Sequence, residues 1–303
     1  AQAGAIAPLV TLVQSGTAGQ KERAAGALWN LAANAEYQVL IAQAGAIAPL
    51  VTLVQSGTAG QKERAAGALW NLAANAEYQV LIAQAGAIAP LVTLVQSGTD
   101  GQKEQAAAAL RNLAINAENQ VLIAHAGATA PLVTLLQSGT AGQKEQAAGA
   151  LWNFAANNTE NKVLIAQAGA IAPLVTLVQS GTAGQKEHAA GALASLAGND
   201  ENQVLIAQAG AISPLVTLVQ SGTAGQKEYA ADALWNLAAN NAENQVLIAQ
   251  AGAIAPLVTL VQSGTAGQKE YAAGALAILA CNDENQVLIA QAGAIAPLVT
   301  LVQ

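Results

Sequence analysis

The chain has 303 residues, of which 53% are hydrophobic and only 3% aromatic, and its Lys and Arg total 11 against 18 Asp and Glu. The net charge of -7 repels a polyanion, because nucleic-acid binding depends on basic groups that displace counterions, so we expect no nucleic-acid partner. No uninterrupted apolar run approaches the ~20 residues of a membrane-spanning helix, so we expect a soluble chain and no membrane partner.

The cysteines and histidines of the chain indicate its compartment and argue against a metal site. Cys281 is the single cysteine and no secretory leader pattern opens the sequence, which favours a reducing compartment, cytoplasmic or nuclear. We interpret Cys281 as a small buried residue in place of Ala, since no base partner is evident nearby. His125 and His188 lack metal-ligand spacing and the Gly-rich stretches lack the phosphate-loop order, so we expect no metal, no cofactor and no enzyme.

Prolines divide the chain into periods of 41 or 42 residues, and residues 1–41 and 42–82 are identical. The two longer periods each carry one extra Asn, at Asn157-Asn158 and Asn240-Asn241. A fixed period of this length is typical of a solenoid. It predicts a single domain over 1–303, with six complete repeats and a partial repeat at each end. The prolines are Pro8, Pro49, Pro90, Pro131, Pro173, Pro214, Pro256 and Pro297.

The period that follows residue 46 predicts two helices in succession. Apolar residues at helical spacing, with Pro49 in the first turn and Gly57 just past the end, predict a short helix, the second helix of a repeat. Thr58 stands three residues before Gln61, a capping-box pattern that predicts the start of a longer third helix. We expect this helix to reach Asn75, because Asn tolerates the left-handed conformation that ends many helices.

A shorter first helix is predicted over 80–86, before the next second helix. Three helices in about 41 residues cannot close a hydrophobic core alone and must stack on their neighbours. The predicted fold class is therefore all-α, a solenoid of three-helix repeats. The absence of Met and the near-identity of the repeats indicate an engineered or recombined array.

The segment GAIAPLVTLVQSGTAGQKERAAGALWNLAANAEYQVLIAQA resembles the armadillo repeat of plant and protist multi-repeat proteins and, more distantly, of importin-alpha and beta-catenin. HEAT repeats are the alternative, but they are two-helix units without the Asn of the A-L-x-N-L segment. The resemblance implies a right-handed superhelical solenoid whose third helices line a concave groove. It also implies a non-catalytic scaffold that binds an extended peptide or a disordered protein segment in that groove.

In that family the Asn of A-L-x-N-L binds the backbone of the ligand, since a carboxamide both donates and accepts. The series is interrupted at Ser195 and Ile278. The alternative interpretation is a helix residue that pairs with solvent or with a neighbouring helix. The matching positions are Asn30, Asn71, Asn112, Asn153 and Asn236.

The repeats differ mainly along one stripe of the third helix. Residues seven positions before the Asn, with Asp232 four before it, share its face, and we predict that they select ligand side chains. Relaxed constraint on an exposed face produces the same variation. The predicted specificity residues are Arg23, Arg64, Gln105, Gln146, His188, Tyr229, Asp232 and Tyr271.

Directly before the Asn stands a large residue, whereas the Trp of importin-alpha stands four residues before. We predict that these residues form the groove rim, or alternatively pack between adjacent third helices. They are Trp29, Trp70, Arg111, Trp152 and Trp235.

The distribution of charge divides the predicted groove. Toward the N-terminus, Arg23, Arg64 and Arg111 favour acidic residues of the ligand. Toward the C-terminus, Asp232, Tyr229 and Tyr271 favour cationic ones.

A structural or engineered scaffold without an evolved ligand is the competing hypothesis. Both ends of the sequence carry AQAGAIAPLVTLVQ and lack a polar capping repeat. We therefore expect head-to-tail homo-oligomers through uncapped ends.

Overall fold

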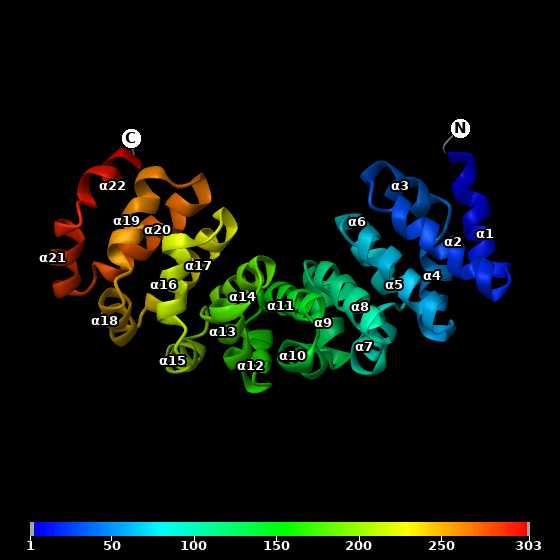
Figure 1. Cartoon of the computed structure of the whole chain (residues 1–303), viewed down its shortest axis with the longest axis horizontal. Helices are drawn as coiled ribbons and strands as arrows, with labels where there is room; N and C mark the ends of the chain where they lie inside the picture. Colours follow the sequence, from blue (N-terminus) through cyan, green and yellow to red (C-terminus); the bar gives the residue numbers. More distant parts are fainter. Residues whose placement is uncertain (1–2, 302–303) are drawn as a thin grey trace. The chain divides into compact units, whose positions relative to one another are not determined.

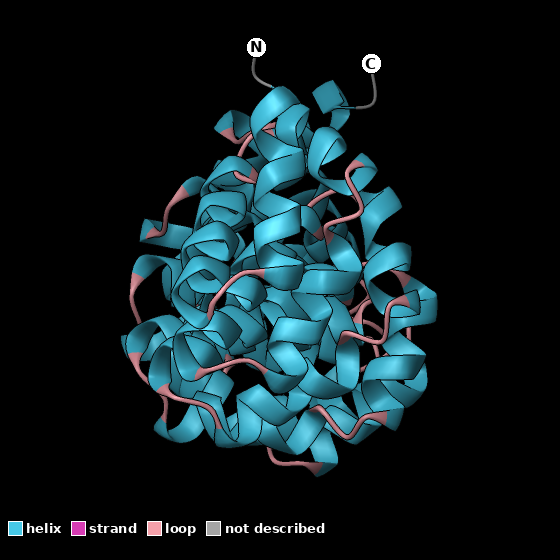
Figure 2. Ribbon diagram, turned by 90° about the vertical axis from the view of Figure 1, so that its right-hand side faces the viewer, coloured by secondary structure: helices cyan, strands magenta, loops and turns pink. Residues whose placement is uncertain are grey.

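The computed structural model describes residues 3–301, and its secondary structure is α-helical apart from a 3-10 turn at Ala3–Ala5 (Figure 1). Helices make up 81% of the chain, and the described residues contain no strand (Figure 2). Two compact units are present, Ala1–Phe154 and Ala155–Gln303. Each unit is a stack of three-helix repeats, so the predicted all-α solenoid is confirmed.

Apart from the last one, the second helices begin without a side-chain cap, carry Pro in their first turn and end at a Gly. The N–H of Gly57, for example, donates to Leu53 O at 2.9 Å. The predicted start and stop signals are therefore confirmed. The second helices are α1 (Ile6–Ser15), α4 (Ile47–Ser56), α7 (Ile88–Ser97), α10 (Thr129–Ser138), α13 (Ile171–Ser180), α16 (Ile212–Ser221), α19 (Ile254–Ser263) and α22 (Ile295–Leu301).

The third helix begins at the predicted capping box. Thr58 Oγ1 accepts from the Gln61 N–H at 3.4 Å and Gln61 Oε1 accepts from the Thr58 N–H at 3.1 Å, so two otherwise unpaired donors are satisfied. The third helices are α2 (Ala18–Leu31), α5 (Ala59–Leu72), α8 (Asp100–Leu113), α11 (Ala141–Ala155), α14 (Ala183–Leu196), α17 (Ala224–Ala238) and α20 (Ala266–Leu279).

The first helix begins earlier than predicted, at an Asn cap. The prediction that Asn75 ends the third helix in the left-handed conformation is wrong: Asn75 has φ −93° and its Oδ1 accepts from the Glu77 N–H at 3.0 Å. Asn is among the best N-cap residues, and this role outweighs its tolerance of positive φ here. The first helices are α3 (Ala35–Gln43), α6 (Ala76–Gln84), α9 (Ala117–His125), α12 (Thr159–Gln167), α15 (Asp200–Gln208), α18 (Ala242–Gln250) and α21 (Asp283–Gln291).

The left-handed asparagines are the residues that lengthen two periods. Asn157 and Asn240 have φ of 53° and 55°, two residues after the ends of α11 and α17, which are each 15 residues long instead of 14. The extra residue therefore lengthens the third helix, while the loop that follows it keeps three residues. A second left-handed position, Gly86 at φ 79°, links the first helix to the second.

Stacking of repeats forms the hydrophobic core. Within a repeat the second helix packs on the third, and between repeats the third helices pack on one another, as α2 does on α5 and α14 on α17. Leu69 and Leu72 are fully buried between them.

Amide side chains join successive repeats through hydrogen bonds that spacing does not reveal. Gln61 Nε2 donates to Ala18 O at 2.8 Å, one repeat earlier, and Gln38 Nε2 donates to Asn71 O at 3.1 Å, one repeat later. The capping-box Gln therefore also joins two repeats.

Gln61→Ala is expected to lower the free energy of unfolding by about 1–3 kcal/mol, because it removes a capping interaction and a bond between repeats. Gln20 is the matched control, since it makes the same capping box but is exposed and donates to no earlier repeat. Gln20→Ala is expected to cost about 1 kcal/mol or less. Urea denaturation followed by far-ultraviolet circular dichroism compares the two, and equal losses would contradict the second role of Gln61.

Among residues 3–301, no single helix is both apolar and long enough to cross a membrane. Six pairs of a first and a second helix are long and apolar enough only when the two helices are taken together, and each pair bends by 83–85° at the break between them.

Candidate functional site

The five predicted Asn residues lie near the C-terminal ends of third helices, in corresponding positions. Asn30 is exposed, and the other four are half-buried. In the unit of residues 1–154, α2, α5 and α8 pack in succession, so their Asn residues follow one another along one stripe. Asn236 occupies the same position in the second unit.

Three of these carboxamides bond to the preceding repeat. Asn71 Nδ2 donates to Trp29 O at 2.9 Å, Asn112 Nδ2 to Trp70 O at 3.1 Å and Asn153 Nδ2 to Arg111 O at 2.9 Å. Asn236 Nδ2 donates instead to Asp232 Oδ1 at 2.8 Å. The alternative interpretation, in which the Asn pairs with a neighbouring helix, therefore describes Asn71, Asn112 and Asn153.

These bonds use half of the donor capacity of each carboxamide. A primary amide carries two N–H donors and an acceptor oxygen. The Oδ1 atoms of Asn71, Asn112 and Asn153 accept no hydrogen bond from the described residues. Each half-buried Asn therefore keeps one N–H and its oxygen for a further partner, while the bond between repeats fixes its orientation.

The large residues directly before the Asn pack against the next third helix. A Cβ placed on Gly67 would lie 2.5 Å from Trp29 Cε2, and one on Gly274 would lie 2.9 Å from Trp235 Cε2. Arg111 fills the same space, because a Cβ on Gly149 would lie 2.8 Å from its Cδ. Glycine four residues before the Asn therefore makes room for the preceding repeat.

Two predicted specificity residues contact this row of large residues. The Arg64 guanidinium lies 5.4 Å from the ring centroid of Trp29, within the range of a cation–π interaction. Arg111 Nη1 donates to Gln146 Oε1 at 3.3 Å.

The remaining specificity residues of the first unit differ in exposure. Arg23 is exposed, whereas Gln105 is half-buried and its Oε1 is buried without a hydrogen-bond partner.

In the second unit His188 is buried, and Tyr229 is half-buried. Tyr271 lies 6.1 Å from Trp235, ring centroid to ring centroid, at a 49° tilt. Burial, and then the Asp232 charge, raise the pKa of Tyr271. Burial raises the pKa of Asp232 to about 6, although the Asn236 hydrogen bond acts in the opposite direction, and Glu228 adds to the rise.

Asp232 is expected to make the second unit more stable in mild acid. Its folded pKa of about 6 lies above its ordinary value of 3.8, so the contribution is complete below about pH 4 and lost as the pH rises through about 6. Asp232→Asn should remove this part of the pH dependence. Urea denaturation of both proteins across this range measures it, with Asp200→Asn, an exposed carboxylate, as the control. Parallel pH profiles for all three proteins would contradict the assignment.

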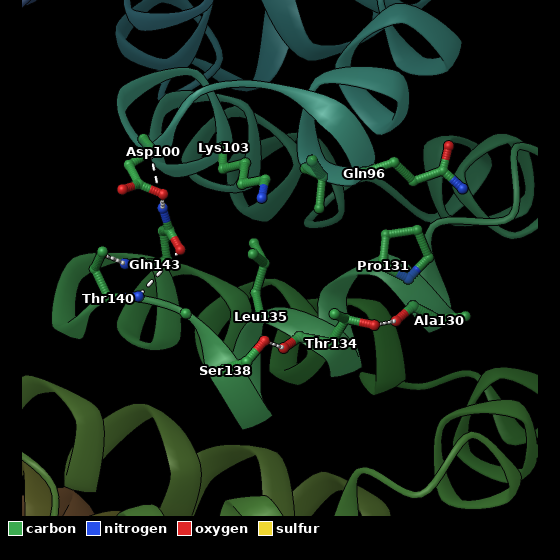
Figure 3. Close-up of a pocket in the computed structure, with 12 residues that line it drawn as sticks. Gln96, Asp100, Lys103, Ala130, Pro131, Thr134, Leu135, Ser138, Thr140 and Gln143 are labelled. Atoms are coloured by element: carbon green, nitrogen blue, oxygen red, sulfur yellow. Dashed lines mark hydrogen bonds between the residues drawn. The ribbon is translucent and has the colours of Figure 1, made fainter.

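Surface hollows recur between the second helices of neighbouring repeats. One of these hollows, of about 400 Å³, lies between α7–α8 and α10–α11, with Lys103 and Pro131 in its lining (Figure 3). Gln143 Nε2 donates there to Asp100 O at 3.0 Å and to Asp100 Oδ1 at 3.1 Å. Matching hollows beside Lys62 and Lys269 show that this hollow follows from the shared part of the repeat.

Cys281 is exposed, so the prediction that it is buried is wrong. It stands at the loop position after the third helix, where Ala74 and Ile115 are also exposed. Among the described residues, no three His, Cys, Asp or Glu side chains gather in a metal-binding arrangement.

The model of the Armadillo/beta-catenin-like repeat matches residues 1–33, 34–74, 75–115, 116–156, 158–198, 199–239 and 241–281. The chain belongs to the armadillo repeat family. No curated protein matches it. Solved structures that it resembles include designed armadillo repeat proteins, and the near-identical repeats fit an engineered or recombined array.

Three of these structures illustrate the likeness. The designed armadillo repeat protein YIII(Dq)4CqI is 31% identical, with a TM-score of 0.72 over 77% of this chain and 99% of its own. An engineered protein is 30% identical, with a TM-score of 0.73 over 98% of this chain and 84% of its own. The designed armadillo repeat protein YIII(Dq.V1)4CPAF, in complex with the peptide (KR)4, is 29% identical, with a TM-score of 0.69 over 77% of this chain and 99% of its own.

Proposed function

We propose that this armadillo repeat chain is a non-catalytic scaffold that binds an extended peptide segment of another protein along its third helices. The observation that carries the proposal is the row Asn71, Asn112 and Asn153, in which each carboxamide is held by the preceding repeat and keeps one N–H and Oδ1 available. This pair of groups matches the N–H and C=O of a peptide unit. A designed relative in complex with the peptide (KR)4 supports the proposal.

The spacing of the repeats suits an extended ligand. Packed helices lie about 8–10 Å apart and an extended peptide advances about 3.3 Å per residue, so each repeat addresses two or three ligand residues. Backbone contacts alone provide affinity without sequence preference. We propose that the predicted specificity residues select side chains, with Arg23 and Arg64 favouring acidic ligand residues at their end of the row.

The test is fluorescence polarisation with peptides of about ten residues selected from a random library. The double variant Asn71→Ala with Asn112→Ala should weaken binding about tenfold, since each net hydrogen bond contributes about 0.5–1.5 kcal/mol. Because both residues also join repeats, circular dichroism must show that the variant is folded at the assay temperature. Arg23→Glu with Arg64→Glu should instead change which peptides are selected. Unchanged binding by a folded double Asn variant would overturn the proposal.

Self-association through the terminal repeats is a second proposal, favoured by the exposure of apolar side chains there. Ile295 is 64% exposed, whereas the equivalent Ile254 is 6% exposed. Leu9 is half-buried, whereas its equivalent Leu50 is fully buried. Analytical ultracentrifugation over a range of concentrations tests the proposal. Ile295→Lys should reduce the average mass, and a strict monomer at high concentration would contradict it.

A further inference from the structure

Five departures from the repeat gather around one cavity of about 230 Å³ in the unit of residues 155–303. The other repeats carry Gln at the position of Lys162, Ala or a larger residue at that of Gly198, and Gly or Ala at that of Asp232. At the positions of Ala194 and Ser195, most repeats carry a large residue followed by Asn. The five departures are Lys162, Ala194, Ser195, Gly198 and Asp232, and Ala156, Asn157 and Asn236 complete the lining.

These departures fit one another sterically. A Cβ on Gly198 would lie 2.6 Å from Lys162 Nζ, so glycine at that position leaves room for the lysine in the conformation that it adopts. Asp232 stands where Gly67 and Gly274 face a preceding Trp, and the corresponding residue before it is the small Ala194. The cavity therefore occupies space that a Trp and an Asn fill elsewhere, and it is lined with polar groups.

Opposite charges line the cavity without pairing. Asp232 Oδ1 accepts from Asn236 Nδ2 at 2.8 Å, but no described cation lies within 4.0 Å of the carboxylate. Lys162 Nζ makes no hydrogen bond or ion pair with the described residues. Burial lowers the pKa of Lys162 and raises that of Asp232 to about 6, because neither charged form is stabilised by an opposite charge.

The ligand class follows from this balance. A cationic side chain would pair with Asp232 but be repelled by Lys162. An anionic side chain would pair with Lys162 but be repelled by Asp232. A primary carboxamide is neutral, donates through its nitrogen and accepts through its oxygen. The cavity is smaller than the roughly 300–1,000 Å³ of sites for drug-sized molecules, which suits one side chain.

We infer that this cavity is a selective subsite for the Gln or Asn side chain of a bound peptide, with Asp232 accepting from its amide N–H and Lys162 donating to its oxygen. The inference rests on the proposed peptide-binding function and assigns a residue preference to one position of the ligand. Ser195 and Asn157 supply further hydrogen-bonding groups at the edge of the cavity.

The experiment selects peptides of about ten residues from a phage-displayed random library on the whole chain and on three variants. Lys162→Gln and Asp232→Gly introduce residues that the other repeats carry at these positions, so they are compatible with the fold. Lys227→Gln is the control for loss of one positive charge, since Lys227 lies in α17 outside the cavity lining. Circular dichroism verifies that each variant is folded.

The parent chain and Lys227→Gln should enrich Gln or Asn at one ligand position, and this preference should disappear in the other two variants. A synthetic peptide with Met in place of that Gln should bind about tenfold more weakly, because the two half-buried charges would lose the hydrogen-bond partners that the carboxamide supplies. Enrichment without a Gln or Asn position, or with Lys, Arg, Asp or Glu there, would overturn the inference and leave the proposed function intact. Failure to enrich any peptide would overturn both.

Discussion

Leu69→Ala is expected to lower the free energy of unfolding by about 2–5 kcal/mol. Leu69 is fully buried in α5, a helix that packs on the second helix α4 and on the neighbouring third helices α2 and α8. Truncation removes its transfer free energy and leaves a cavity that helices on several sides cannot readily close. Each repeat contacts only its neighbours, so the loss also weakens the coupling between repeats and should broaden the unfolding transition.

Leu81→Ala is the matched control for this substitution. Leu81 lies in the first helix of the next repeat, α6, but its side chain is 42% exposed, so its truncation should cost well under half as much. Urea denaturation followed by circular dichroism measures both variants. Equal losses would show that the buried face of the third helix is wrongly assigned.

The fold was predictable because the signals of each repeat are local and occur many times. Pro49 and Gly57 mark a helix through backbone geometry, and the pair Thr58 and Gln61 marks another through hydrogen bonding. The role of Asn75 was predicted wrongly because an Asn between two helices can end one or cap the next. Its extended backbone, which the sequence does not reveal, decides for the cap.

The candidate site was predictable only as a face. Helical spacing placed Asn71, Asn112 and Asn153 on one stripe, but the bonds that orient them run to carbonyl groups of the preceding repeat. Backbone carbonyl groups carry no sequence signal, so residue types alone do not reveal such bonds. The cavity beside Asp232 was not predictable for a related reason. Its lining comes from α12, α14, α17 and the loops after α11 and α14, so no single helix face carries its pattern.

A correlation between neighbouring repeats was nevertheless present in the sequence. Trp29 precedes Gly67 by 38 residues and Arg111 precedes Gly149 by the same interval, whereas the small Ala194 precedes Asp232. The structure supplies the reason, since the large residue occupies the space of a Cβ on the next third helix. The variable stripe is therefore constrained in pairs of repeats, and a residue of this stripe cannot be exchanged without regard to its neighbour.

Gly67→Asp is expected to cost about 1–3 kcal/mol in the parent chain, because the carboxylate would collide with the Trp29 ring and be partly desolvated. With Trp29→Ala in the same chain the cost should fall, since Ala194 and Asp232 form this pairing naturally. Aspartate is the informative substitution, because Ala108 shows that one methyl group is accommodated at the equivalent position after Trp70.

The measurement is a double-mutant cycle of the parent, both single variants and the double variant, by urea denaturation. Trp29→Ala alone should destabilise the chain by removing packing, so only the coupling free energy tests the pairing. We expect a coupling of about 0.5–3 kcal/mol that favours the double variant. Losses that add to within about 0.5 kcal/mol would show that Gly67 does not depend on Trp29, and the cavity beside Asp232 would then need another explanation.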